Sequence, residues 1–162
     1  MLMSRYAAWR AVVEAYQTCN QRYARLMKRF DLTSSQFDVL FVIESLGDQA
    51  SPKNVATGLL VTMGNVTSVT RRLLERGLVE QVANAVDKRS VQLRLTEQGS
   101  ALLSEAKASS KLFVEHQLSP FSEEEVEVVG RLMQRMRAHL ESNEFQQSLE
   151  QIVQESSPGA TL

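Results

Sequence analysis

Hydrophobic residues recur at steps of three or four positions along most of this chain, which is the period of an amphipathic helix. The longest such pattern covers residues 4–30. Its apolar members fall on one helix face: Tyr6, Trp9, Val13, Tyr16, Cys19, Tyr23, Met27 and Phe30. A second long pattern runs from Val126 to Leu140. Together the two faces carry more apolar surface than one small domain can bury, so they predict contacts with another surface.

Short polar residues indicate where further helices begin. Thr33 with Gln36, and Ser122 with Glu125, form capping boxes that satisfy free amides of a first helical turn. Ser51 precedes a proline, which is also typical of a helix start. The predicted helices begin after Thr33, Ser51, Thr62, Thr96 and Ser122, and end near Gly47, Leu60, Gly77, Pro120 and Leu140. Residues 146–162 are predicted as a helix end followed by a frayed tail.

Apolar and polar residues alternate in Val91–Leu95, the pattern of a half-buried strand. Leu78 and Val79 predict a partner strand, and the polar residues 84–89 predict the loop that joins the two strands. The expected order is therefore three helices, a turn, a fourth helix, strand, loop, strand and two further helices. We expect a mainly α fold with a small sheet of two to three strands that projects as a wing.

The charges are unevenly spread, although the net charge of the 162 residues is only −1. Residues 62–94 hold three acids, Glu75, Glu80 and Asp87, and six bases: Arg71, Arg72, Arg76, Lys88, Arg89 and Arg94. This segment therefore carries a charge of +3 and the remainder carries −4. A basic patch on an acidic body suits a polyanionic partner at one face, but chance clustering would give the same count.

Several classes of protein are disfavoured by what the sequence lacks. One cysteine cannot form an internal disulfide, and no apolar run reaches the roughly 18 residues of a membrane span. The first residues lack the apolar core of a signal peptide, so a cytoplasmic protein without membrane contact is expected. His116 and His139 are isolated, and no phosphate-binding loop or metal-ligand cluster occurs. We therefore expect no enzyme activity, no metal and no cofactor.

The helices before and after Thr62 form a candidate helix-turn-helix pair, in which the second helix enters a DNA major groove. Its exposed face is predicted to present Thr62, Asn65, Thr67, Ser68 and Arg71, while Gly64 permits close approach of the backbone. Short polar side chains with a basic group one turn later can reach base edges and phosphates. An ordinary surface helix rich in serine and threonine would show the same pattern.

The polar loop strengthens this interpretation. Arg89 at a wing tip can enter a narrow minor groove, and Lys88 can neutralise a phosphate. Asp87 is unsuited to contact DNA, so it is expected to position a nearby arginine, for which Arg72 is the candidate, by a charge-assisted hydrogen bond. A plain exposed hairpin is the alternative.

Three motifs together resemble the MarR (multiple antibiotic resistance regulator) family between Leu32 and Gly99. They are LTSSQFDVL, GNVTSVTRRLLERGLV and DKRSVQLRLTEQG, in this order and spacing. By the resemblance, Arg89 matches the arginine of the family's Asp-x-Arg wing motif, and Arg72 pairs with the motif's aspartate, Asp87. The resemblance implies a winged helix-turn-helix at 31–99 and dimerisation helices at 1–30 and 100–145.

The resemblance also implies a function. Such a chain would be a transcriptional regulator, expected to be a repressor, that binds a pseudo-palindromic operator as a homodimer. Many relatives are released from double-stranded DNA by a small aromatic or phenolic ligand, and here Tyr16, Cys19, Tyr23, Phe37 and Phe41 are the candidate pocket residues. An amphipathic core would look the same. Two alternatives are a redox sensor acting through Cys19 and a winged-helix interaction module that does not bind DNA.

Overall fold

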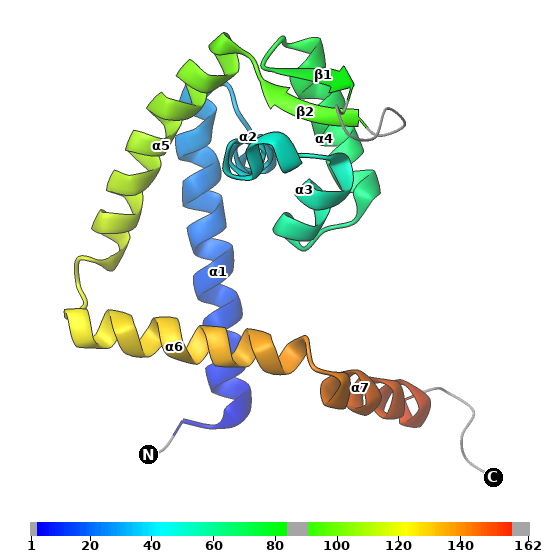
Figure 1. The fold of residues 1–162 in the computed structure, drawn as a ribbon. Helices are drawn as coiled ribbons and strands as arrows, with labels where there is room; N and C mark the ends of the chain where they lie inside the picture. The colour runs from blue at the N-terminus through cyan, green and yellow to red at the C-terminus, as the bar shows by residue number, and fades with distance from the viewer. Residues whose placement is uncertain (1–2, 84–90, 157–162) are drawn as a thin grey trace. The chain divides into compact units, whose positions relative to one another are not determined.

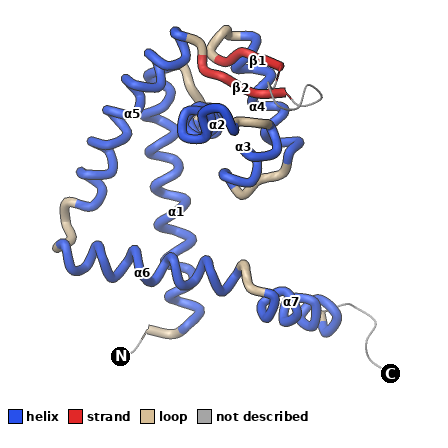
Figure 2. The backbone as a smooth tube through the Cα atoms, in the orientation of Figure 1, coloured by secondary structure: helices blue, strands red, loops and turns tan. Residues whose placement is uncertain are grey.

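The computed structural model describes residues 3–83 and 91–156 (Figure 1). Helices dominate this part of the chain, and two antiparallel strands form its one small sheet (Figure 2). The elements are α1 (Arg5–Met27), η1 (Lys28–Phe30), α2 (Ser34–Leu46), η2 (Gly47–Gln49), α3 (Pro52–Leu59), α4 (Met63–Glu75), β1 (Val79–Ala83), β2 (Val91–Leu95), α5 (Glu97–Leu118), α6 (Glu123–Leu140) and α7 (Asn143–Glu155). The predicted fold class is confirmed.

The helices begin where the capping residues predicted. Thr33 and Gln36 exchange two hydrogen bonds at the start of α2, as a capping box requires. Ser51 caps α3, and the hydroxyl of Thr96 accepts the Gly99 amide in the first turn of α5. Local polar side chains therefore set the boundaries of these helices, because each satisfies an amide that has no partner within the helix.

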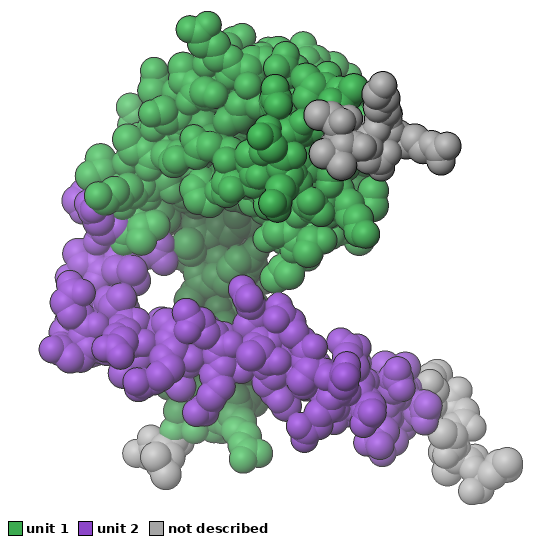
Figure 3. Space-filling model, viewed as in Figure 1, with its two compact units in different colours: residues 1–114 green, residues 115–162 purple. Residues whose placement is uncertain are grey.

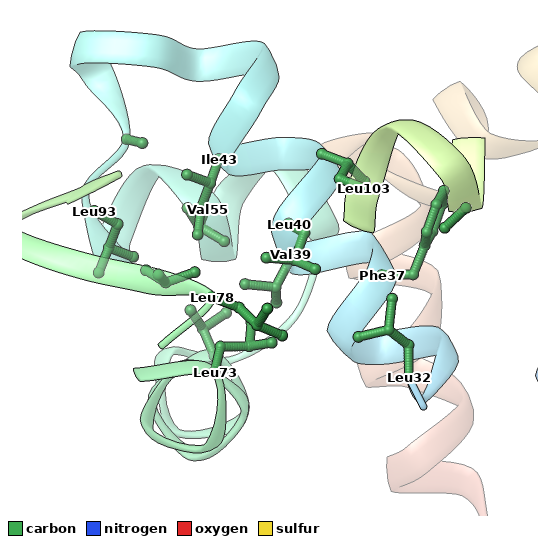
Figure 4. Packing of buried hydrophobic residues seen from close by; sticks show 14 of the residues in the cluster. Leu32, Phe37, Val39, Leu40, Ile43, Val55, Leu73, Leu78, Leu93 and Leu103 are labelled. Atoms are coloured by element: carbon green, nitrogen blue, oxygen red, sulfur yellow. The ribbon is translucent and has the colours of Figure 1, made fainter. Parts of the chain in front are cut away.

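The chain forms two compact units, residues 1–114 and residues 115–162, and the boundary falls within α5 (Figure 3). The first unit contains α1–α4, the sheet and most of α5. Its core is almost entirely aliphatic, with side chains from α2, α3, α4, both strands and α5 packed together (Figure 4). Leu40, Val55, Leu73, Leu93 and Leu103 are completely buried in it.

The sheet pairs Val79 with Leu95 and Ala83 with Val91. Its first strand starts at Val79 and runs to Ala83, so it is longer than the two residues that the sequence indicated. On the opposite edge of β2, the Leu93 amide donates to the Ala50 carbonyl at 2.7 Å. The sheet is therefore attached directly to the segment that joins α2 to α3.

The second unit contains the end of α5 together with α6 and α7. Ser142 caps α7, so Asn143–Glu155 is a helix separate from α6, whereas the sequence predicts a helix end and a frayed tail from residue 146 onward. The described residues of α6 and α7 include no buried side chain, and their large apolar residues are partly exposed: Val128, Val129, Leu132, Met133, Met136, Leu140, Leu149, Ile152 and Val153. Among the described helices, none is long and apolar enough to cross a membrane.

Candidate nucleic-acid interface

Helices α3 and α4 form the helix-turn-helix pair that the sequence predicts. Val55 and Ala56 bury one face of α3, while Val66, Thr70 and Leu73 bury one face of α4. The tight turn between the helices places Leu60 in the left-handed region, with φ 55°. Because both inner faces contribute to one core, the position of α4 is fixed by α3 and by α2 behind it.

The outer face of α4 is polar and open to solvent. The residues predicted to face DNA from this helix are all exposed: Thr62, Gly64, Asn65, Thr67, Ser68, Arg71 and Arg72. At 100° per residue, Gly64, Ser68 and Arg71 lie opposite the buried side of α4, and Asn65 with Arg72 lie on one flank. The structure thus brings the predicted α4 residues onto one continuous surface.

The polar side chains of this surface differ in how much of their hydrogen-bonding capacity is used within the protein. Thr62 caps α4 by accepting the Asn65 amide at 3.4 Å, and the Thr67 hydroxyl donates to the Met63 carbonyl at 2.8 Å. Both threonines thus use part of their hydrogen-bonding capacity within the helix. The side chains of Asn65 and Ser68 make no hydrogen bond with another described residue, so they retain their full capacity for an external partner.

Two arginines of the predicted basic patch are already paired with acids elsewhere in the chain. The Arg76 guanidinium pairs with the Asp31 carboxylate at 3.1 Å and donates to the Asp31 backbone carbonyl at 2.6 Å. Arg94 binds the Asp48 carboxylate at 3.0 Å. The net +3 of residues 62–94 therefore overstates the free positive charge at this face. Sequence reasoning missed both pairs, because their partners lie 45 and 46 positions away.

The remaining arginines of α4 are more available. Arg71 lies 3.9 Å from Glu75 one turn later, and both side chains are well exposed. Such a surface pair is weak and is easily exchanged for another anion. Arg72 is exposed on the flank of α4. Its predicted partner Asp87, together with Lys88 and Arg89, lies outside the described residues, so the wing contacts stay predictions.

A cavity of about 330 Å³ lies beside α4. Residues of α2, of the end of α3, of the following turn and of α4 line it: Ser35, Asp38, Val39, Leu59, Val61, Asn65, Val66, Ser68 and Val69. Burial raises the pKa of the Asp38 carboxyl above its usual range. This carboxyl forms no hydrogen bond or ion pair with another described residue. The cavity therefore combines apolar walls with one carboxyl group and the two uncommitted polar side chains of α4.

Three of the five candidate pocket residues form an aromatic cluster. Tyr23 packs edge to face on Phe37, with ring centroids 5.8 Å apart, and Phe37 stacks on Phe41 at 6.2 Å. The Tyr23 hydroxyl lies 2.9 Å from that of Ser110 on α5. Burial raises the pKa of the Tyr23 phenol, against the opposite effect of this hydrogen bond. Tyr16, which lies earlier in α1 than Tyr23, is 70% exposed, and Cys19 lies between the two tyrosines in the helix and is partly buried.

The side chains that could ligate a metal are dispersed. Within residues 3–83 and 91–156, no three His, Cys, Asp or Glu side chains lie close enough together to hold a metal ion. His139 instead packs against the ring of Phe145 at 5.4 Å.

Comparison with known proteins gives a consistent assignment. A family model described as the MarR family matches residues 30–90. An uncharacterized HTH-type transcriptional regulator of Bacillus cereus is 31% identical over 143 residues, which are 86% of this chain and 92% of that protein. The HTH-type transcriptional regulator PecS of Dickeya dadantii is 29% identical over 121 residues, 74% of this chain and 73% of that protein.

Solved structures of similar fold support the same family assignment. A mutant MarR from E. coli, crystallised with operator DNA, has a TM-score of 0.71 and 25% identity, covering 78% of this chain and 91% of that chain. AbsC from Streptomyces coelicolor, a MarR family transcriptional regulator, has a TM-score of 0.79 at 17% identity, covering 86% and 96%. The relatives are regulators and not enzymes, as the sequence analysis expected. The chain belongs to the MarR family of winged helix-turn-helix transcriptional regulators.

Proposed function

We propose that this protein is a cytoplasmic repressor that binds a pseudo-palindromic operator in double-stranded DNA as a homodimer. The observation that carries the proposal is the polar outer face of α4, where Asn65 and Ser68 have uncommitted hydrogen-bonding groups beside Arg71 and Arg72. A helix of this kind fits a major groove about 12 Å wide. The related structure of the E. coli MarR mutant with operator DNA supports the same partner for this chain.

The exposed apolar faces support the homodimer. On α1, Tyr6 and Trp9 are 67% and 57% exposed, and their rings pack against each other 5.7 Å apart. Apolar side chains of α6 and α7 are exposed as well. Exposed apolar helix faces of this kind are typical of interfaces, and a two-fold dimer meets a two-fold operator. The occupant that fits best is a second copy of the same chain.

Release by a small aromatic or phenolic ligand is the regulatory part of the proposal. The cavity beside α4 has a volume within the range of small-molecule sites, and its lining includes Asn65 and Ser68. A ligand there would compete for side chains that the DNA contact uses. The aromatic cluster of Tyr23, Phe37 and Phe41 offers a second place, with Tyr16 and Cys19 nearby on α1.

The decisive experiment is a binding titration with the DNA immediately upstream of the gene, against a shuffled duplex of equal length. We expect tight binding to the first and weak binding to the second, with the affinity falling steeply with salt because phosphate contacts release counterions. Equal affinity for both duplexes at all salt concentrations would contradict sequence-specific binding to the DNA upstream of the gene. Repeating the titration with phenols and aromatic acids tests the release.

Replacing single arginines separates the DNA-binding regulator from an interaction module without DNA binding. Arg89→Ala should weaken operator binding about tenfold or more, since a wing arginine contributes both charge and groove contact. Arg131→Ala removes the same charge from the exposed surface of α6 and should leave affinity unchanged. Equal effects of the two variants would contradict the assignment of the wing.

A further inference from the structure

The segment that joins α2 to α3 holds the outer edge of β2. Asp48 accepts two hydrogen bonds at one carboxylate oxygen, from the Gln92 side-chain amide at 3.1 Å and from the Arg94 guanidinium at 3.0 Å. Between them along the strand, the Leu93 amide donates to the Ala50 carbonyl at 2.7 Å. Three consecutive residues of β2 are therefore attached to two nearby residues of the segment that leads into α3.

Strand geometry explains why one carboxylate can reach two residues of β2. Gln92 and Arg94 are two positions apart, so their side chains lie on the same face of the strand. The amide of Leu93 points away from β1, because its partner is Ala50. A hairpin of two strands is only marginally stable by itself, so the direction of this sheet depends on what holds its second edge.

The burial of the three side chains shows what each bond contributes. Gln92 is only 5% exposed, and a buried amide without a partner is costly, so its bond to Asp48 is needed locally. The Asp48 side chain is 89% exposed and that of Arg94 is 51% exposed. A pair this exposed to solvent adds little to global stability. Asp48 is thus suited to orient β2 more than to hold the fold together.

We propose that Asp48 is a positioning residue for DNA binding, which sets the direction of the wing relative to α3 and α4. This inference rests on the proposed function. The strand that Asp48 holds begins directly after residues 84–90, which include Lys88 and Arg89. Asp48 holds that strand from the segment between α2 and α3, so the orientation of the wing is tied to the start of α3. The Asp48 carboxylate also neutralises Arg94, so contacts with DNA phosphates fall to other basic side chains of the protein.

The first test needs no DNA. In Asp48→Ala, the backbone amide of Leu93 should exchange with deuterium at least about fivefold faster, while the melting temperature changes by no more than a few degrees. Asp48→Asn keeps an oxygen that can accept from Gln92 and should preserve much of the protection. Unchanged exchange at Leu93 in Asp48→Ala would overturn the proposal, whatever the DNA result.

The second test compares operator with random duplex. Asp48→Ala should lose about fivefold to tenfold of its preference for operator, while binding to random duplex stays equal or rises because a negative charge is gone. Glu97→Gln removes a charge from an exposed residue in the first turn of α5, outside β2, and it should leave the preference intact. Equal preference in Asp48→Ala and the wild type would show that Asp48 does not position the wing.

Failure of the proposed function and failure of the positioning role of Asp48 give different results. A wild type that binds neither duplex contradicts the proposed function, and the exchange at Leu93 then still decides whether Asp48 orders β2. If Asp48→Ala fails to fold, Asp48→Ser carries both tests, because it removes the carboxylate that accepts from Gln92 and Arg94 and leaves only a short side chain. Asp48→Asn loses the charge but keeps the hydrogen-bond acceptor. Equal affinity of this variant for operator and for random duplex would therefore also overturn the positioning role.

Discussion

Gly99 lies so close to Leu78 that a Cβ atom on Gly99 would overlap the carbonyl oxygen of Leu78. This carbonyl cannot move away easily, because it accepts the Thr96 amide at 3.2 Å. The hydroxyl of Thr96 in turn donates to the Gly77 carbonyl at 2.7 Å. The first turn of α5 therefore fits against the start of β1 only because residue 99 has no side chain.

Gly99→Ala should consequently destabilise the protein by about 1–3 kcal/mol, since the new methyl group forces the backbone of α5 and β1 apart. Chemical denaturation of the purified variant measures this directly. Gly64→Ala is the matched control, because a Cβ there meets only the Thr62 hydroxyl oxygen at 3.9 Å. Its stability should equal or exceed that of the wild type. An equally stable Gly99→Ala would mean that the two elements can separate without cost.

Gly64→Ala serves a second purpose, since Gly64 was predicted to permit close backbone approach to DNA. The variant should fold normally and yet bind operator more weakly, by roughly 1–2 kcal/mol, if DNA lies against this part of α4. A titration by fluorescence anisotropy compares it with the wild type. Undiminished affinity would place the backbone of α4 away from the DNA.

Asn65→Ala and Ser68→Ala should change which operator sequences are preferred. Their side chains have no described partner within the protein, so truncation removes external contacts without leaving an internal group unsatisfied. Each lost base contact should reduce discrimination at one position of the site by roughly 1–3 kcal/mol. Selection from a randomised operator library gives the preference of each variant. Weaker binding to every sequence alike would instead indicate contacts with phosphates.

The elements whose signals are local could be predicted from the sequence. Thr33 with Gln36 and Ser122 with Glu125 form their capping boxes within four residues, so the pattern of letters specifies the contact. Ser142 caps α7 in the same local way, so the start of this helix is also visible in the sequence. The predicted exposed face of α4 followed from helical periodicity alone.

The partners of the basic residues could not be predicted in this way. Arg76 meets Asp31 and Arg94 meets Asp48 only because the folded core brings separate segments together. No spacing rule connects positions 45 or 46 residues apart. For the same reason the cavity beside α4 was not foreseen, since α2 and α4 line it jointly.

Asp38 should give the protein a specific dependence on pH. Burial raises the pKa of this carboxyl in the folded state, so ionising it costs more in the folded chain than in the unfolded chain. Below the unfolded pKa the group is protonated in both states and carries no penalty. As the pH rises through the folded pKa the penalty develops fully, and it stays constant above.

Asp38→Asn should therefore be slightly more stable than the wild type at pH 7, by about 1–3 °C in melting temperature, since part of the side chain still contacts solvent. The difference should shrink as the pH is lowered towards the ordinary aspartate range. Thermal melts of both proteins between about pH 3.5 and pH 8 provide the comparison. A constant difference over this range, or a less stable Asp38→Asn at neutral pH, would contradict the assigned effect of burial.

Cys19→Ser distinguishes release by a ligand from release by oxidation. Cys19 is partly buried on the apolar stripe of α1, where a thiol packs as a small hydrophobic group. The serine variant should bind operator like the wild type and respond to the same ligands. Treatment of both proteins with peroxide during operator binding is the direct measurement. If peroxide releases the wild type from operator while Cys19→Ser stays bound, the protein is a redox sensor and not a ligand-controlled regulator.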